Sequence, residues 1–240
     1  MKAIILAAGV GSRIKPLTDN CPKSLLKVAG HTLLERMVSQ IQDCEINEII
    51  FVLGYLDKQI KNFVKKKFPN LNAKFIINDK FKETNTGFSL MLTKNFVQGE
   101  PFIKFDADVI FDIEILKKLI ESKHENCLCI DKNINLQEEE IKVVVGENNK
   151  ILAVSKTVNP KSAIGESLGI EKISAEMSNI LFEELESMMA EKKNHQNYYE
   201  SAYEKIINKN IPFYCVDVTG LKWTEIDTKE DFINALAIFA

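Results

Sequence analysis

The sequence lacks the features of a nucleic-acid coat and of a membrane-spanning protein. Its 31 basic residues face 34 acidic ones, and the formal net charge is −3 at pH 7. Without an excess of positive charge, no general field attracts a polyanionic backbone. No apolar run approaches the roughly 20 residues that a membrane helix needs. We therefore expect no nucleic-acid partner and no membrane insertion, while a local basic site for a small phosphorylated ligand stays open.

Cysteine is present, but in no pattern typical of a disulfide framework or a metal site. The five cysteines are an odd number and are widely spread, at Cys21, Cys44, Cys127, Cys129 and Cys215. The apolar start MKAIILAAG reaches glycine too early for a signal peptide. These features predict reduced thiols and a cytoplasmic location.

Arginine is also scarce. Only Arg13 and Arg36 among the 31 basic residues are arginine, and the others are lysine. In a chain that uses lysine almost everywhere, an arginine inside a glycine loop indicates a function. The planar guanidinium of Arg13 can bind a phosphate through two parallel hydrogen bonds, which a lysine cannot reproduce.

Strand-like runs and helical patterns alternate through the first half of the chain. Strands are predicted at about 2–7, 47–55, 73–78 and 101–109, and helices at about 31–42, 57–67 and 87–95. From about residue 126, short runs without helices between them predict antiparallel strands, followed by helices near 175–192, 197–208 and 229–239. Continuous apolar strands separated by helices are typical of a parallel sheet covered on both faces. We expect an α/β fold with a doubly wound, mostly parallel sheet and an antiparallel extension.

A glycine loop, Gly9-Val10-Gly11-Ser12-Arg13, follows the first predicted strand. Backbone N–H groups at the carboxyl edge of a parallel sheet can converge on a phosphate. The spacing fits neither the dinucleotide-binding fingerprint, which needs glycine at position 14, nor a P-loop. An ordinary glycine turn is the alternative. Arg13 and the downstream Pro22-Lys23 favour phosphate binding, because Pro22 stiffens the chain that aims the Lys23 amine.

Two carboxylates, Asp106 and Asp108, end the strand predicted at 101–109. Alternate side chains of a strand share a side, so both are expected in the crevice beside the glycine loop. Oxygen ligands next to phosphate groups favour Mg²⁺. The alternative is a helix N-cap, with Asp108 or Asp112 preceding the helical segment IEILKKLI.

A further acidic motif, W-T-E-I-D-T, occupies residues 223–228. Asp227 or Thr228 can cap the helix predicted at 229–239, and capping alone would explain both residues. A metal-binding role for Asp227 requires that the fold bring it to Asp108.

Together these motifs resemble the nucleotidyltransferase family, which includes the sugar-1-phosphate nucleotidylyltransferases. The family pattern L-A-A-G-x-G-[ST]-R-[LMI]-x-P-L-T-x-x-x-P-K matches residues 6–23 at every position, and the resemblance continues to about residue 235. It implies a Rossmann-like sheet whose antiparallel extension forms the acceptor lobe. We expect one domain, 1–240, with a nucleotide-binding core at 1–125, an acceptor-binding section at 126–222 and a closing strand and helix at 223–240.

The resemblance also implies a role for each motif. Three cations would act in catalysis: Arg13 on the β- and γ-phosphates of a nucleoside triphosphate, Lys23 on its α-phosphate, and Lys156 on the acceptor's phosphate. Asp108 and Asp227 would hold Mg²⁺, the expected cofactor. The nucleotide-binding residues would be Leu6, Ala7, Ala8, Gly9, Gly11, Ser12, Arg13, Lys23, Asn78, Asn85, Thr86, Gly87, Ser89 and Asp106.

Shorter motifs indicate the base and the acceptor. The segments N-D-K at 78–80 and N-T-G-F-S-L at 85–90, with the ending E-I-D-T-x-E-D-F, are similar to the CTP:phosphocholine cytidylyltransferase branch. This similarity implies CTP and a small phosphate or phosphonate, for example phosphocholine, aminoethylphosphonate or a phosphorylated amino-acid derivative. Glu166, Tyr198 and Glu200 are candidates for binding the acceptor's amine, hydroxyl or cationic group. For the tyrosines at 198 and 199, packing of a helix N-terminus on the core is the alternative.

Two other functions stay open at this point. One is a sugar-1-phosphate nucleotidylyltransferase that uses UTP, dTTP or GTP. The other is a non-catalytic regulatory module that binds nucleotide, which the presence of Arg13, Lys23, Asp108 and Asp227 disfavours. A homodimer is compatible with each of these functions.

Overall fold

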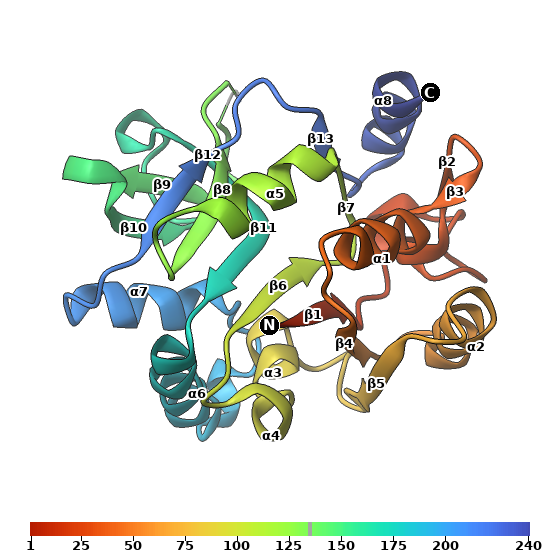
Figure 1. The fold of residues 1–240 in the computed structure, drawn as a ribbon, viewed down its shortest axis with the longest axis horizontal. Coiled ribbons are helices and arrows are strands. Elements are labelled where there is room, and N and C mark those ends of the chain that lie inside the picture. The colour runs from red at the N-terminus through yellow and green to blue at the C-terminus, as the bar shows by residue number, and fades with distance from the viewer. Residues whose placement is uncertain (134–135) are drawn as a thin grey trace.

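The computed structural model describes residues 1–133 and 136–240, and a nine-stranded sheet forms its centre (Figure 1). The strands of this sheet are β1 (Lys2–Ala7), β4 (Glu48–Leu53), β5 (Asn72–Ile77), β6 (Phe102–Asp106), β8 (Cys127–Asp131), β9 (Lys142–Val145), β10 (Ile151–Ser155), β11 (Gly165–Ile173) and β12 (Tyr214–Asp217). Their order is β10-β9-β11-β6-β1-β4-β5, with β8 pairing with both β11 and β12. Two short pairs lie outside it: β2 (Lys27–Val28) with β3 (His31–Thr32), and β7 (Val109–Phe111) with β13 (Trp223–Glu225).

The sheet has a parallel half and a mainly antiparallel half, in which β12 alone among the described strands pairs parallel, with β8. Strands β6, β1, β4 and β5 run parallel, so that Leu6 of β1 lies in register with both Val52 and Asp106. Strand β11 runs antiparallel to β6, β8 and β9. The mostly parallel sheet with an antiparallel extension is therefore confirmed. Because β1 and β6 are parallel neighbours, the glycine loop after β1 and the acids after β6 emerge at the same edge.

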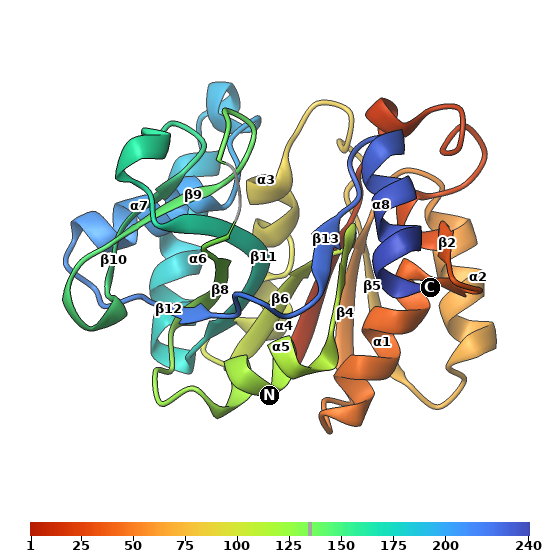
Figure 2. The ribbon, with the colours of Figure 1, turned by 90° about the horizontal axis from the view of Figure 1, so that it is seen from above.

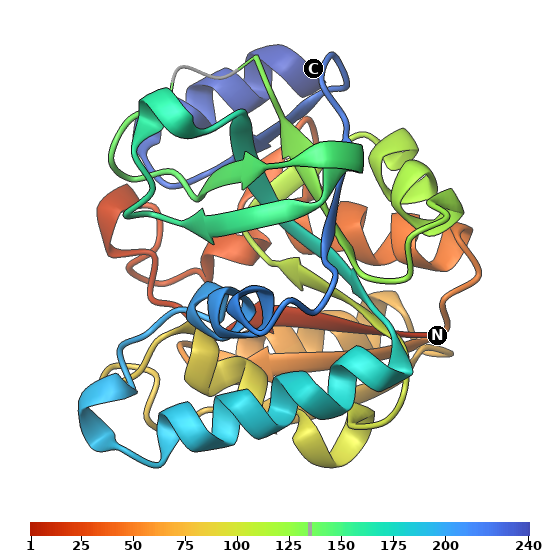
Figure 3. The ribbon, with the colours of Figure 1, turned by 90° about the vertical axis from the view of Figure 1, so that its left-hand side faces the viewer.

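Helices cover both faces of the sheet, as Figure 2 shows for its parallel half. Helices α1 (Leu33–Asp43), α2 (Asp57–Lys67) and α5 (Ile113–Glu121) pack on the face that carries Ile5 and Phe105. The opposite face, with Ile4 and Phe102, is covered by α3 (Thr86–Met91), α4 (Lys94–Val97), α6 (Ala175–Met189) and α7 (Glu200–Asn208). Figure 3 shows α3, α6 and α7 lying together on this side. The alternation of apolar side chains along each strand thus supplies two cores from one sheet.

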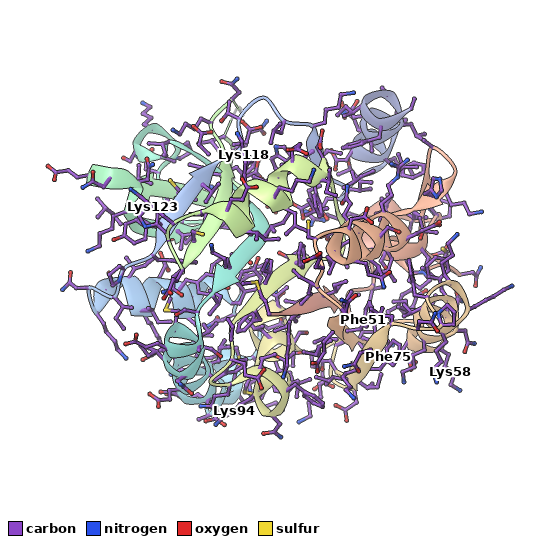
Figure 4. All side chains as sticks on the ribbon, viewed as in Figure 1. Phe51, Lys58, Phe75, Lys94, Lys118 and Lys123 are labelled. Carbon is purple, nitrogen blue, oxygen red and sulfur yellow. The ribbon has the colours of Figure 1, made fainter. Side chains whose placement is uncertain are left out.

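Individual side chains follow this layering. Phe51 of β4 and Phe75 of β5 stack on the same face with ring centroids 5.3 Å apart, while Lys58 of α2 is exposed at the outer side of the molecule (Figure 4). Helix α8 (Lys229–Phe239) packs on a third, smaller cluster that contains Ile14 and Leu33. The C-terminal helix therefore covers the segment that follows the glycine loop. Of the helices in the described ranges, none has the length and hydropathy needed to span a membrane.

Three predicted helices differ from the structure in their bounds. The helix expected at 87–95 is split into α3 and α4, and the buried hydroxyl of Thr93 donates to the Leu90 carbonyl at the break. The helix expected at 197–208 begins at Glu200, because the preceding carbonyl of Asn197 accepts from the Gly87 N–H. The helix expected at 175–192 ends at Met189.

Two side chains cap the helices that follow the acidic motifs. Asp112 accepts from the Glu114 N–H at the start of α5, and Thr228 accepts from the Asp231 N–H at the start of α8. Asp231 in turn accepts from the Thr228 N–H, which completes a capping box. The N-cap positions are therefore filled by Asp112 and Thr228, not by Asp108 or Asp227.

Candidate active site

A cavity of about 1740 Å³ opens at the carboxyl edge of the parallel strands. Strand ends, the glycine loop, the start of α3 and the antiparallel extension all contribute to its wall. The candidate residues that line it are Leu6, Ala7, Ala8, Gly9, Gly11, Ser12, Arg13, Lys23, Asn78, Asn85, Thr86, Ser89, Asp106, Asp108, Lys156, Glu166, Tyr198, Glu200 and Asp227. The fold therefore gathers candidates from both ends of the chain at one opening.

Gly87 is the exception, because it does not belong to the cavity wall. A Cβ atom there would lie 2.7 Å from Met189 Cε and 2.8 Å from the Asn197 carbonyl oxygen. The position needs glycine for packing between α3 and the segment before α7. Its expected contact with the nucleotide stays a prediction.

The glycine loop brings Lys23 beneath Gly11. Gly11 has a φ of 64°, which favours glycine, and a Cβ there would lie 3.3 Å from Lys23 Cβ and 3.2 Å from Thr18 Cγ2. The Thr18 hydroxyl donates to the Gly11 carbonyl at 2.7 Å. The loop therefore folds back on itself, which places the Lys23 amine at the base of the cavity.

Lys23 lies between the two carboxylates that were expected to bind metal. Its Nζ is 2.7 Å from Asp108 Oδ2 and 2.6 Å from Asp227 Oδ1, and Arg13 Nη2 is 2.5 Å from Asp227 Oδ2. Burial opposes the charge on Lys23, but the carboxylates of Asp108 and Asp227 outweigh it and raise the pKa of the amine. The fold thus brings Asp227 to Asp108, as a metal-binding role requires.

Glu225 is a third carboxylate at this point, and sequence reasoning missed it. One oxygen from each of Asp108, Glu225 and Asp227 lies within 4.8 Å of the others. The signal was available, because Glu225 precedes Asp227 by two residues in the same motif. A set of three converging carboxylates suits a hard divalent cation such as Mg²⁺. The residues present therefore fit the expected cofactor.

Glu139 lies between two cations of the cavity, Arg13 and Lys156. Its Oε2 lies 3.6 Å from Arg13 Nη1 and 3.3 Å from Lys156 Nζ. Arg13 was expected to bind the triphosphate and Lys156 the acceptor's phosphate. One carboxylate reaches both, so the two candidate phosphate sites are neighbours.

A buried polar cluster underlies Asp106. Lys104 is fully buried, and its Nζ lies 2.8 Å from Asp106 Oδ2 and 2.9 Å from Glu171 Oε2. Tyr199 donates from its hydroxyl to Asp106 Oδ2 at 2.6 Å. Sequence reasoning did not single out Lys104 or Glu171. Asp106 thus lines the cavity while its carboxylate is bonded to Lys104 and Tyr199.

The residues before α7 divide between core and cavity. Tyr199 is buried, in agreement with packing on the core, whereas Tyr198 is partly exposed and lines the cavity. Glu200 is buried beside it, and its Oε2 has no hydrogen-bond partner among the described residues. Burial raises the pKa of Glu200 to about 7, with Lys104 opposing the shift and Asp106 adding to it.

Polar side chains near α3 hold one another in place. Asn78 donates from Nδ2 to Thr84 Oγ1 at 3.0 Å and to Ser89 Oγ at 3.1 Å. Asn85 accepts from the Thr86 N–H at 2.8 Å and so caps α3. These bonds fix the wall of the cavity next to the glycine loop.

Comparisons with known proteins identify the family to which the chain belongs. A family model described as "Nucleotidyl transferase" matches residues 2–140. The bifunctional IPC transferase and DIPP synthase of Aquifex aeolicus is 31% identical over 235 residues, which cover 97% of this chain and 50% of that protein. This chain therefore spans about half the length of that relative. The CTP:phosphoglutamine cytidylyltransferase of Campylobacter jejuni is 28% identical over 250 residues, with 96% and 97% covered.

A solved structure shows the same fold over the whole chain. The CTP:phosphocholine cytidylyltransferase from Streptococcus pneumoniae superposes with a TM-score of 0.81 at 25% identity. The superposition covers 100% of this chain and 99% of the other.

Proposed function

The chain belongs to the nucleotidyl transferase family, and from this we propose that it is a Mg²⁺-dependent cytidylyltransferase. It would transfer CMP from CTP to a small phosphomonoester or phosphonate and release pyrophosphate. One observation supports this above the others: Lys23 contacts Asp108 and Asp227 at the base of a cavity that also contains Arg13 and Lys156. Cations for two phosphate groups and carboxylates for a metal ion thus share one opening.

The reaction needs positioning and charge neutralisation but no covalent enzyme intermediate. A phosphate or phosphonate oxygen of the acceptor attacks the α-phosphorus of CTP in line. The bond from the α-phosphorus to the bridging oxygen of the β-phosphate breaks, and pyrophosphate leaves with that electron pair. Both reactants are anions, so the main barrier to their approach is electrostatic.

The basic residues of the cavity divide this work. Arg13 would bind the leaving pyrophosphate portion, Lys23 the α-phosphate, and Lys156 the attacking group. Asp108, Glu225 and Asp227 would hold Mg²⁺, which when bound neutralises charge on the phosphates. This assignment gives each charged group of the substrates a partner of opposite sign.

The choice of CTP and of a small acceptor is supported by similarity. Two relatives named for CTP-dependent transfer, to phosphoglutamine and to phosphocholine, match almost the whole of this chain and of their own. Their acceptors are small phosphorylated molecules. We therefore infer a phosphorylated acceptor of similar size for this chain.

Pyrophosphate release provides the test. The purified protein is incubated with Mg²⁺, each of the four nucleoside triphosphates, and a panel of small phosphates, phosphonates and sugar 1-phosphates. We expect release with CTP and a non-sugar acceptor. Release only with a sugar 1-phosphate would overturn the acceptor class, and a preference for UTP, dTTP or GTP would overturn the base.

Matched aspartate variants connect the activity to the site. Asp108→Asn removes a carboxylate of the metal site, so we expect turnover to fall by about a hundredfold or more. Asp112→Asn, four residues away, lies outside the cavity wall and keeps a good N-cap for α5. Equal activity in the two variants would exclude the proposed metal site.

A further inference from the structure

Acidic side chains gather on the acceptor side of the cavity. The ends of β8 and β11 and the segment 137–141 contribute Asp131, Glu138, Glu139, Glu140 and Glu166 to the wall. Two basic residues of the cavity contact this group, and both are at the same carboxylate: Lys156 lies 3.3 Å and Arg13 3.6 Å from Glu139. An acceptor that carried only negative charge would be repelled by this wall. The wall therefore favours an acceptor that also carries a positive group.

Glu166 is a buried member of this group whose carboxylate lacks a hydrogen-bond partner among the described residues. It lines the cavity but is only 8% exposed, and no described residue donates a hydrogen bond to its carboxylate. Asp131 lies opposite it in the β8–β11 ladder. Burial, together with the charges of Glu140 and Asp131, raises the pKa of Glu166 to about 8. A buried carboxylate without a donor is unfavourable, so the free site keeps this carboxyl protonated at neutral pH. A cationic ligand that donates hydrogen bonds would favour the ionised form and release the proton.

Lys142, the strand neighbour of Glu166, does not donate a hydrogen bond to its carboxylate. Lys142 pairs with Glu166 across β9 and β11, but its amine donates to the main-chain carbonyls of residues 137, 138 and 140 at 2.9, 3.1 and 3.0 Å. All three N–H groups of the ammonium are thus used. Lys142 shapes the acidic segment and leaves Glu166 free.

Asp131 is held in place beside Glu166. Its Oδ2 accepts from Trp223 Nε1 at 2.8 Å, and its Oδ1 accepts from the Asn133 N–H at 2.9 Å. Each carboxylate oxygen can accept a second bond. Two neighbouring carboxylates, one oriented and one without a donor, therefore face the cavity.

Two tyrosine rings of the acceptor side already face lysine amines. Lys104 Nζ lies 3.6 Å from the ring centroid of Tyr199, and Lys156 Nζ lies 4.9 Å from that of Tyr198. Trp223 directs its N–H edge to Asp131. A quaternary ammonium, which has no N–H, is bound mainly by open aromatic faces. The surroundings favour carboxylates as the groups that bind a cation here.

We propose that Glu166, with Asp131 beside it, binds a protonated primary amine carried by the phosphorylated acceptor. A primary ammonium supplies positive charge and three N–H donors, which match two carboxylates with free acceptor positions. The inference rests on the proposed function, because it names the acceptor class for the same site. The acceptor is an aminoalkyl phosphate or phosphonate with the amine unmethylated.

Three acceptors that differ at a single group test this on the unaltered protein. Pyrophosphate release from CTP is measured with phosphoethanolamine, phosphocholine and 2-hydroxyethyl phosphate. We expect kcat/KM for phosphoethanolamine to exceed both others by about 10- to 100-fold, the range for a charge-assisted hydrogen bond. Equal or faster turnover of phosphocholine would overturn the amine subsite while leaving CMP transfer established. Silence with every nucleotide and acceptor would overturn the proposed function itself.

The variant Glu166→Gln tests whether Glu166 causes the preference for phosphoethanolamine. In Glu166→Gln, we expect the ratio of kcat/KM between phosphoethanolamine and 2-hydroxyethyl phosphate to fall by about tenfold or more. Glu183→Gln is the matched control, because Glu183 is exposed on α6 and lies outside the cavity wall. A ratio that is the same in both variants would remove Glu166 from the subsite.

Discussion

The ammonium of Lys23 lies 2.6 Å from Oδ1 of Asp227, which follows it by 204 residues in the chain. Asp108 accepts the same ammonium, and Arg13 contacts the other oxygen of Asp227. In this arrangement, cations suited to phosphates neutralise carboxylates suited to a metal ion. When nucleotide and metal ion bind, these ion pairs must break. The phosphates then contact Lys23 and Arg13, and the metal ion contacts the carboxylates. Metal and nucleotide are therefore expected to bind cooperatively.

Replacing Lys23 tests this exchange. In Lys23→Gln, the three carboxylates of the metal site lose a neighbouring positive charge, so we expect Mn²⁺ to bind about tenfold more tightly without nucleotide. CMP transfer should fall by about 100- to 1000-fold, because the α-phosphate loses its partner. Mn²⁺ is used here as a paramagnetic probe in place of Mg²⁺, and its affinity is measured by electron paramagnetic resonance titration.

Lys15→Gln is the control for this measurement. Lys15 is an exposed lysine that pairs with Asp19 and lies outside the cavity wall. An Mn²⁺ affinity that stays unchanged in Lys23→Gln would show that Lys23 does not compete with the metal.

Arg13→Lys separates charge from geometry. The variant keeps the positive charge but loses the planar fork, so we expect kcat/KM for CTP to fall by about tenfold or more. Steady-state kinetics with varied CTP provides the measurement. Arg36→Lys is the control, because Arg36 donates to the Val28 carbonyl away from the cavity. If the two variants behave alike, bidentate phosphate binding by Arg13 is excluded.

Local patterns were sufficient to predict most of the architecture. The helix at 57–67 was predicted at its observed bounds, since two buried side chains, Ile60 and Val64, recur at helical spacing between polar residues. The glycine loop and the acids after 101–106 could be placed at one sheet edge, because parallel neighbours share their carboxyl ends. These predictions need only the periodicity within one helix and the parallel pairing of neighbouring strands, which the α/β pattern implies.

The partners inside the site could not be predicted in this way. Lys104 interrupts an apolar strand, and the carboxylate that accompanies it, Glu171, becomes its neighbour only through the register of β11 against β6. Glu139 meets Arg13 and Lys156 through a segment without regular secondary structure. Such contacts depend on tertiary register, on which short sequence patterns carry no information.

Lys104→Met tests the buried cluster. Removing the cation leaves Asp106 and Glu171 buried without their partner, so we expect a loss of about 3–5 kcal/mol in the free energy of unfolding. Urea denaturation at neutral pH measures it. Lys118→Met, on the exposed side of α5, should change stability by less than about 0.5 kcal/mol. A comparably small effect at Lys104 would mean that the cluster is neutralised by proton uptake.

Glu139→Gln tests the carboxylate between the two phosphate sites. Substrate phosphates must displace Glu139 from Arg13 and Lys156, so its removal should lower KM for CTP and for the acceptor by about two- to threefold. The effect should be small and should vanish at high salt, because the pair is exposed. Steady-state kinetics at low and high salt measures it.

Glu147→Gln controls for the loss of one exposed negative charge. Glu147 is exposed and is not part of the cavity wall. The same decrease of KM in Glu147→Gln would assign the effect to net charge and not to the position of Glu139.

The pH dependence of stability reports on Glu166. Burial and the neighbouring charges of Glu140 and Asp131 raise the pKa of its carboxyl from 4.5 to about 8 in the folded chain. Between these pH values the folded state keeps a proton that the unfolded state has released. The free energy of unfolding therefore falls as the pH rises from about 4.5 to about 8.

Glu166→Gln removes this titration, so the variant should lose less stability than the natural protein on going from pH 5 to pH 8. The difference is expected to be on the order of 3 kcal/mol, measured by urea denaturation without ligands. Glu200, whose pKa of about 7 acts in the same direction, remains in both proteins and leaves a residual slope. Glu183→Gln should follow the natural protein at both pH values, because Glu183 is exposed. Parallel profiles for Glu166→Gln and the natural protein would show that the Glu166 carboxyl is ionised across this range and that Asp131 does not perturb it.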